Sequence, residues 1–260
     1  MDFGISDRTA LVTGGAGRIG SKDCEILAQE GADVYVLDVD EDGVSETVDE
    51  LNDAGYEGTA YPAVCDLTDR DDVSDTIDEV REQHGGVDIL VNNAAMVDAR
   101  SQLKNYDDDL WDRDTEINLT GTYNISKEVF PDMLEQEWGR VINMSSMAGW
   151  YGGFGQASYS ATKAALIGLG KTMALEGAQS GVTSNIIAPN VVVEDMADMS
   201  REELKEFDEY FYRIADATAM KRLGREADVA NMVAYLSSEQ ANYVTGQVVG
   251  VTGGIDLFTF

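Results

Sequence analysis

Residues 11–20 read Leu11-Val12-Thr13-Gly14-Gly15-Ala16-Gly17-Arg18-Ile19-Gly20, and this stretch decides the fold. Its apolar start is typical of a buried β-strand, and the apolar residues at 24, 26 and 27 continue with helical spacing. Gly15, Gly17 and Gly20 form a Gly-x-Gly-x-x-Gly pattern between the two. Such glycines let the backbone approach a pyrophosphate, while the helix N-terminus supplies N–H donors and the positive end of its dipole. The stretch predicts a dinucleotide-binding turn, although the motif alone is weak among 26 glycines.

Short apolar runs recur along the chain and alternate with amphipathic stretches such as 71–84, where Val73, Ile77 and Val80 have helical spacing. The predicted strands are 9–13, 33–37, 58–64, 87–92, 140–144, 182–188 and 247–251. Strands separated by helices imply right-handed crossovers and a parallel sheet covered on both faces. We therefore expect an α/β protein with a Rossmann-type, doubly wound, seven-stranded parallel sheet. With three prolines and no linker-like stretch, residues 1–260 should form a single dinucleotide-binding and catalytic domain.

The charge balance excludes several classes of partner. The chain has 18 Lys and Arg against 49 Asp and Glu, a formal net charge of −31. A surface this negative repels phosphate backbones and anionic lipid, so we expect neither nucleic-acid nor membrane binding. The acids are dispersed, as in proteins of salt-loving microbes, where ions screen the self-repulsion. We favour a halophilic protein, and an ordinary acidic protein is the alternative.

Metal, disulfide and membrane functions find no support in the sequence. Cys24 and Cys65 are the only cysteines and His84 is the only histidine, which is too few for a disulfide framework or a metal site. There is no apolar run of about 18 residues, and residues 1–4 do not resemble a signal peptide. We expect no metal and a cytoplasmic location.

Asp38 closes the second predicted strand, 18 residues after Gly20. A carboxylate there can accept hydrogen bonds from both ribose hydroxyls of NAD, and it would repel the extra phosphate of NADP. A solvated loop acid is the alternative, because residues 40–42 are also acidic. We predict NAD as the cofactor, while Arg18 in the phosphate loop is a feature that would favour NADP.

Tyr159 and Lys163 are four residues apart, which puts them on one face of a helix. A free tyrosine has a pKa near ~10, too high for a base at neutral pH. A nearby ammonium favours the phenolate and lowers that pKa. The pair therefore predicts a general acid/base, although the spacing is common by chance.

Two further polar residues could act beside this pair. Ser146 follows the predicted strand 140–144 and could donate to a substrate oxygen, with Ser145 as its rival and a turn role as the alternative. Asn118 is a polar residue in the helical stretch 110–134, where a structural hydrogen bond within the helix is the alternative.

Together these motifs resemble the short-chain dehydrogenase/reductase family over essentially the whole chain. The matching pieces are Thr13-Gly14 to Gly20, Asp66-Leu67, Asn92-Asn93-Ala94-Ala95, Asn118, Ser146, Tyr159 with Lys163, Pro189, and Thr245-Gly246 to Gly253-Gly254. Their order and spacing agree, which makes the set more specific than any member of it.

The resemblance implies a role for each residue at the reacting end. Tyr159 would exchange a proton with the substrate oxygen, and Lys163 would lower its pKa and hold the nicotinamide ribose. Ser146 would polarise the carbonyl, and Asn118 would bind a water that links Lys163 to solvent. The implied cofactor-binding set is Gly14, Gly15, Gly17, Arg18, Ile19, Gly20, Asp38, Val39, Asp66, Leu67, Asn92, Asn93, Tyr159, Lys163, Pro189 and Val192. The family also implies a homotetramer that buries helices at roughly 107–135 and 158–178.

Four positions depart from the family pattern. Arg18 stands where a glycine is usual, and Ala95 ends an Asn-Asn-Ala-Gly motif. Asn190 replaces the glycine after Pro189, and asparagine tolerates positive φ better than most residues. Glu194 replaces a threonine, which puts one carboxamide or phosphate contact in doubt.

Two segments should line the substrate pocket. One is 149–155, and the other is an insertion at 194–220, which we call the lid segment. Its apolar residues Leu204, Phe207, Phe211 and Ile214 fall near one helical face. This pattern predicts a lid helix that closes on substrate, and a surface helix packed on its own core is the alternative.

We expect hydride transfer between NAD(H) and a secondary alcohol or ketone, with a small neutral polyol, sugar or cyclic alcohol as the leading substrate. A carrier-protein substrate fits poorly, because related reductases usually dock the acidic carrier on basic residues of the two long helices, whereas residues 135–138 and 173–176 here include none. A 3-hydroxyacyl-CoA or 3-oxoacyl substrate is the alternative. A non-enzymatic NAD-binding sensor usually lacks the tyrosine or the lysine, and a sugar-nucleotide epimerase has a longer C-terminal domain.

Overall fold

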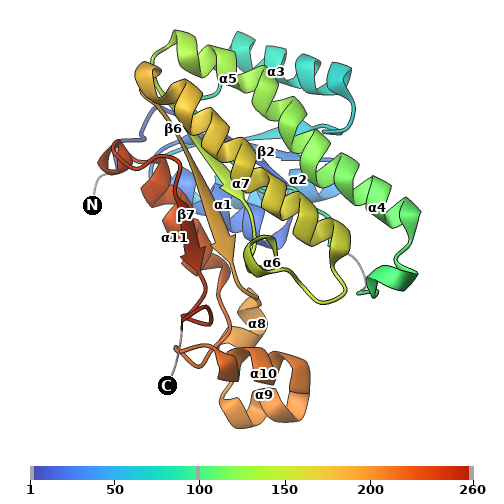
Figure 1. The fold of residues 1–260 in the computed structure, drawn as a ribbon. Helices are drawn as coiled ribbons and strands as arrows, with labels where there is room; N and C mark the ends of the chain where they lie inside the picture. Colours follow the sequence, from blue (N-terminus) through green and yellow to red (C-terminus); the bar gives the residue numbers. More distant parts are fainter. Residues whose placement is uncertain (1–2, 98–99, 258–260) are drawn as a thin grey trace.

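The computed structural model describes residues 3–97 and 100–257, so 1–2, 98–99 and 258–260 of the predicted domain lie outside the described residues. All seven predicted strands form, and they make one parallel sheet of order β3-β2-β1-β4-β5-β6-β7 (Figure 1). Their bounds are β1 Thr9–Thr13, β2 Asp33–Asp38, β3 Ala60–Val64, β4 Ile89–Asn92, β5 Gly139–Met144, β6 Val182–Pro189 and β7 Val248–Val251. The doubly wound Rossmann-type fold is confirmed.

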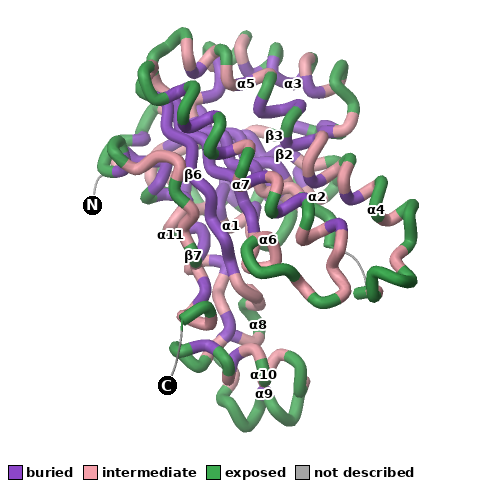
Figure 2. Tube along the Cα trace, in the orientation of Figure 1, coloured by how far each residue is buried: buried purple, intermediate pink, exposed green. Residues whose placement is uncertain are grey.

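Alternating side chains of the strands feed two separate cores. Ala10 and Val12 of β1 belong to the core on one face of the sheet, and Leu11 belongs to the core on the other. The first face is covered by α1 (Arg18–Gln29), α2 (Glu41–Ala54) and α11 (Glu226–Ser237), and the second by α3 (Arg70–His84), α5 (Thr122–Glu135) and α7 (Ala157–Gly177). Because both faces are covered, the central strands are mostly apolar and are among the most buried parts of the molecule (Figure 2).

The turn after β1 requires glycine at two positions. Gly14 has φ +66°, a left-handed conformation that side chains with a Cβ rarely adopt. A Cβ on Gly20 would lie 2.0 Å from the carbonyl oxygen of Gly14. The helix α1 can therefore begin directly against the turn, which leaves the backbone of the turn open toward the cavity described below.

The predicted long helix at 107–135 is interrupted. It consists of α4 (Asp108–Thr115), a π-helical turn η2 (Glu116–Gly121) and α5, and Asn118 lies in the π-helical turn. Single π-turns inside α-helices occur frequently at functional sites. The second predicted long helix, at 158–178, is confirmed as α7.

The prediction of one lid helix is wrong. The lid segment holds α8 (Glu194–Ala197), α9 (Arg201–Phe207) and α10 (Glu209–Ala217). The helix breaks at Asp208, whose extended backbone and carboxylate cap the start of α10 by accepting from the N–H groups of Tyr210 and Phe211. Leu204 is buried in a small core that these helices form with Ala215 and Leu223. The short remaining helices are η1 (Leu103–Asn105), α6 (Met147–Tyr151), η3 (Ala178–Ser180) and η4 (Glu239–Ala241).

The amino-terminal edge of the sheet is held by two arginines. Arg140, at the start of β5, is 1% exposed and donates to the backbone carbonyls of Gly139 and Gly181 at 2.8 and 3.2 Å. Its guanidinium lies 4.2 Å from the ring centroid of Trp138, and that of Arg8, which precedes β1, lies 3.8 Å from the same centroid. These cation–π contacts stabilise the edge opposite the carboxyl ends of the strands.

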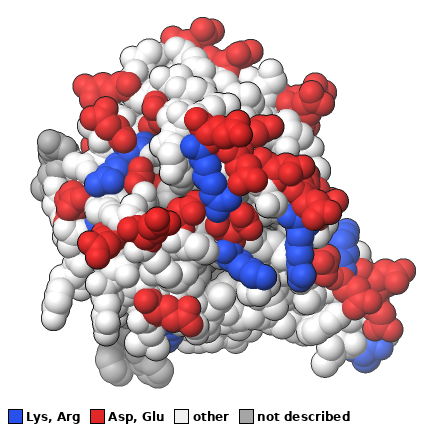
Figure 3. All heavy atoms as spheres, turned by 90° about the horizontal axis from the view of Figure 1, so that it is seen from above, with Lys and Arg blue, Asp and Glu red and all other residues white. Residues whose placement is uncertain are grey.

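The surface carries far more acidic than basic side chains, as Figure 3 shows for one face. Within the described ranges, no helix is long and apolar enough to cross a membrane. The same residues contain no group of three His, Cys, Asp or Glu side chains that could hold a metal ion.

We predict that Gly20→Ala destabilises the fold by about 3 kcal/mol, because the added methyl group overlaps the Gly14 carbonyl. Gly168→Ala in α7 is the matched control, since a Cβ there meets nothing within 4 Å. It should stabilise the protein by about 0.5–1 kcal/mol through helix propensity. Denaturant unfolding measures both, and equal effects of the two substitutions would contradict the steric argument.

Candidate active site

One cavity of about 1550 Å³ runs along the carboxyl edge of the strands. It brings together most of the residues predicted from the sequence: Gly14, Gly17, Arg18, Ile19, Asp38, Val39, Asp66, Leu67, Asn93, Ser146, Tyr159, Lys163, Pro189 and Val192. Gly15, Gly20 and Asn118 are not among the lining residues.

The phosphate loop forms one wall of the cavity. Gly15 turns inward, because its N–H donates to the carbonyl of Leu37 at 2.9 Å. Gly15 and Gly20 therefore shape the loop, while Gly14 and Gly17 present backbone to the cavity. The start of α1 directs free N–H groups and the positive end of its dipole to this wall.

Asp38 closes β2 beside this loop. Its carboxylate accepts from the N–H of Ala16 at 3.3 Å and from that of Val39 at 2.8 Å. Arg18 lines the same cavity, and its guanidinium forms an ion pair of 2.6 Å with Glu226 at the start of α11. Arg18 therefore does not neutralise the negative charge of Asp38.

Glu194, which stands where the family pattern has a threonine, also binds at the start of α11. Its carboxylate accepts from the N–H of Glu226 at 3.0 Å. A side-chain hydrogen bond with Glu226 raises the pKa of Glu194, and burial acts in the same direction. Glu194 thus anchors the lid segment to α11.

The two asparagines after β4 have different surroundings. Asn93 lines the cavity, and its amide donates to the carbonyl of Thr13 at 3.1 Å. Asn92 is 1% exposed and donates to Ser126 and Asn143 at 2.9 and 3.0 Å inside the core. The structure therefore does not bring Asn92 to the cavity, because alternation along the strand turns its side chain inward.

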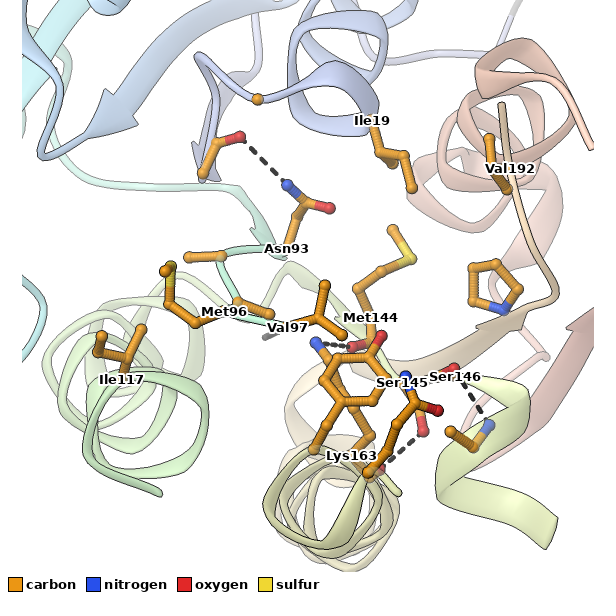
Figure 4. Close-up of a pocket in the computed structure, with 18 of the residues that line it drawn as sticks. Ile19, Asn93, Met96, Val97, Ile117, Met144, Ser145, Ser146, Lys163 and Val192 are labelled. Atoms are coloured by element: carbon orange, nitrogen blue, oxygen red, sulfur yellow. Dashed lines mark hydrogen bonds between the residues drawn. The ribbon is translucent and has the colours of Figure 1, made fainter. Parts of the chain in front are cut away.

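Tyr159 and Lys163 project from the first turns of α7 at the other end of the cavity. Lys163 is 2% exposed, and its amine donates to the carbonyl of Met144 at 2.7 Å (Figure 4). The amine lies 5.9 Å from the centroid of the Tyr159 ring. Burial lowers the pKa of Lys163 to about 7.

Burial also acts on the phenol, in the direction opposite to the expected one. It raises the pKa of Tyr159, and hydrogen bonding with Ser146 partly opposes this rise. The lowering expected from Lys163 is not the dominant effect in this structure. Burial thus disfavours the charged form of both groups.

Of the two serines, Ser146 presents its hydroxyl to the cavity. It caps α6, where its oxygen accepts from the N–H of Ala148 at 3.1 Å (Figure 4). The Ser145 hydroxyl donates to the backbone carbonyl of Lys163 at 2.7 Å. Ser145 therefore positions the turn of α7 that carries the lysine, and Ser146 is the candidate to contact substrate.

Asn118 is completely buried and holds the loop that follows β4. Its side chain accepts from the N–H of Met96 at 2.7 Å and donates to the Met96 carbonyl at 2.9 Å. It also donates to Thr162 of α7 at 3.4 Å. These bonds cross to other elements, which differs from the bond within one helix that sequence analysis weighed.

Sequence analysis missed several residues of the cavity. Met96, Val97 and Arg100 line it from the loop after β4, together with Gln156 before α7. Tyr210 of α10, which also lines it, lies in the lid segment predicted to do so. The available signal was positional, because loops that follow parallel strands meet at one edge of the sheet.

The residues present fit a dinucleotide. The loop at Gly14 and Gly17 leaves room for phosphates that a Cβ would obstruct. Asp38 offers carboxylate oxygens where a ribose would lie, and Cys65, Leu67 and Val39 offer apolar surface beyond it. The same cavity reaches Ser146 and Tyr159, so a nicotinamide and a substrate oxygen could meet there.

Known proteins share this sequence pattern. The family model described as short chain dehydrogenase matches residues 8–205. The 3-oxoacyl-(acyl-carrier-protein) reductase of Staphylococcus epidermidis is 38% identical over 250 residues, which cover 96% of this chain and 99% of that protein.

Solved structures share the fold. A NAD⁺-bound xylitol dehydrogenase has a TM-score of 0.86 and 28% identity, covering 96% of this chain and 99% of that one. A protein described as a gluconate dehydrogenase from Agrobacterium tumefaciens has a TM-score of 0.89 and 29% identity, covering 100% of both chains. The chain belongs to the short-chain dehydrogenase family, whose members are oxidoreductases that act on CH–OH groups with NAD(P).

Proposed function

We propose that this protein oxidises a secondary alcohol of a small hydroxylated substrate, or reduces the matching ketone, with NAD as its cofactor. The observation that carries the proposal is one continuous cavity with Asp38 at one end and Ser146, Tyr159 and Lys163 at the other. Bound NAD supplies the hydride acceptor, and the protein supplies the proton transfer and the alignment.

Each polar group at the reacting end has a distinct task. Tyr159 takes the proton of the substrate hydroxyl during oxidation and returns it during reduction. Ser146 donates a hydrogen bond to the same oxygen, and its contact with Tyr159 stabilises the phenolate. The amine of Lys163 is fixed by its hydrogen bond to the Met144 carbonyl. When this amine is protonated, its positive charge stabilises the phenolate of Tyr159. Asn118 keeps the loop after β4 against α7.

NAD is favoured over NADP by two contacts. Asp38 would repel a phosphate on the adenosine ribose. Arg18, which could attract that phosphate, is paired with Glu226.

The substrate is a polyol or sugar rather than a carrier-bound acyl group. The xylitol and gluconate dehydrogenases of similar fold act, by their descriptions, on small polyhydroxylated molecules. The similarity to the carrier-protein reductase makes 3-oxoacyl reduction the second candidate. A net charge of −31 would repel an acidic carrier protein, which favours the first.

We expect Tyr159→Phe to lower kcat by about 1,000-fold or more, because it removes the group that exchanges the proton. NAD binding, followed by fluorescence quenching, should persist within a few-fold. Tyr243→Phe, at a fully exposed tyrosine, is the control and should leave kcat unchanged. Undiminished turnover by Tyr159→Phe would refute the proposed proton donor.

Asp38→Ala should lower the ratio of kcat/KM for NAD over NADP by about tenfold, because it removes charge repulsion from the second phosphate. Asp40→Ala is the matched control, since Asp40 is two residues away and does not line the cavity. Steady-state assays with both cofactors measure the ratio. An equal effect of the two variants would show that the charge acts only at long range.

Lys163→Met should stabilise the protein while it removes turnover. Burial lowers the pKa of Lys163 from 10.5 to about 7, so the unfolded chain binds this proton more tightly. The destabilisation is complete below pH 7 and is lost as the pH rises toward 10.5. After allowing for the lost bond to Met144, we expect a gain on the order of 3 kcal/mol at pH 6. Urea unfolding at pH 6, 8 and 10 measures it, and a gain that grows with pH would contradict the argument.

A further inference from the structure

Four basic side chains line the cavity, and three of them are already engaged. Arg18 pairs with Glu226 at 2.6 Å. Arg113 pairs with the buried Asp114 at 2.7 Å. Lys163 is buried against the backbone carbonyl of Met144. The fourth is Arg100, in the loop after β4.

Among the described residues, only uncharged side chains hold the guanidinium of Arg100. Its guanidinium hydrogen-bonds the hydroxyl of Tyr210 on α10 and lies 4.3 Å from the centroid of that ring. Among residues 3–97 and 100–257, no acidic side chain forms an ion pair with it. Within the described chain, eight of the ten other arginines form ion pairs, whereas Arg70 and Arg140 hydrogen-bond uncharged groups. The eight are Arg8, Arg18, Arg81, Arg113, Arg201, Arg213, Arg222 and Arg225.

The position of Arg100 joins the lid segment to the reacting end. The next residue, Ser101, donates its N–H to the carbonyl of Gly155 at 3.0 Å. Gly155 lies four residues before Tyr159, and a Cβ on it would be 3.0 Å from that of Arg100. The guanidinium is exposed at the rim of the cavity, between the start of α7 and α10. Arg100 and Tyr159 therefore line the same cavity, with Arg100 at its rim.

The charge of the molecule makes this placement informative. A chain with net charge −31 repels anionic substrates, so it can accept one only where a local cation offsets the field. A guanidinium matches a carboxylate with two parallel hydrogen bonds. One unpaired arginine balances one negative charge, which fits a monocarboxylate better than a phosphate dianion or a coenzyme A thioester.

We propose that Arg100 binds the carboxylate of the substrate, and that the substrate is a small polyhydroxy acid rather than a neutral polyol. This inference rests on the proposed function and changes only its substrate class. The carboxylate lies on Arg100 beside Tyr210, and a secondary hydroxyl lies on Ser146 and Tyr159. Gln156 and Tyr151 line the space between and can hydrogen-bond the remaining hydroxyls.

The test compares acids with the alcohols of the same carbon chain, D-gluconate with D-glucitol and D-xylonate with xylitol. The native enzyme should prefer the acids by about tenfold or more in kcat/KM. Arg100→Gln should lower kcat/KM for the acids by about 10- to 100-fold, mainly through KM, the size expected for a charge-assisted pair. It should change kcat/KM for the polyols less than twofold.

Arg213→Gln is the matched control. Like Arg100→Gln, it removes one positive charge, but Arg213 lies on α10, is paired with Glu209 and does not line the cavity. It should leave the preference for acids unchanged. If Arg100→Gln weakens acids and polyols equally, the arginine only latches the lid segment, and the proposal is overturned. A native preference for polyols, or for acetoacetyl-CoA in the reductive direction, also overturns it.

A binding measurement separates this inference from the proposed function. Thermal shift of the NAD-loaded protein should show stabilisation by D-gluconate that Arg100→Gln abolishes and Arg213→Gln keeps. Such binding without any turnover would support the role of Arg100 and refute the proposed reaction. Turnover of polyols without stabilisation by either acid would refute the role of Arg100 and keep the reaction.

Discussion

All seven strands run in the same direction, so every turn that follows a strand emerges at one edge of the sheet. The phosphate loop follows β1, Asp38 closes β2, and Ser146 follows β5. These residues are distant in the sequence, yet they line one cavity. Strand order reverses between β1 and β4, and the crevice opens at that point. The location of the site therefore depends on strand direction more than on any single motif.

The polar groups of the site lie where burial opposes their charged forms. Burial lowers the pKa of Lys163 and raises the pKa of Tyr159, which favours the neutral form of each. A backbone carbonyl holds the lysine in place, and a hydroxyl partner holds the tyrosine. A site built this way loses stability that apolar residues would provide. Asn118 also departs from what stability alone would favour. It lies in a π-helical turn, where the regular helical hydrogen bonds are lost, and its side chain fastens the loop after β4 to α7.

Strand positions could be predicted from the sequence, since buried runs bounded by turn residues have a clear signature. The break at Asp208 could not, because its carboxylate caps a new helix while the apolar spacing continues across it. The π-helical turn was equally hidden, because the six residues of Glu116–Gly121 are too few to show a periodicity of their own. Arg100 lies in a loop without periodicity, and only its neighbours in space reveal it. The homotetramer, the cytoplasmic location and the halophilic origin stay predictions.

The guanidinium groups of Arg8 and Arg140 both contact the ring of Trp138, at the end of the sheet that faces away from the cavity. Arg8 precedes β1 and Arg140 begins β5, so the same two strands that deliver reactive groups at one end are clamped at the other. The strands β1 and β5 separate these two ends. Substitutions around Trp138 therefore lie a full strand length away from the reactive groups.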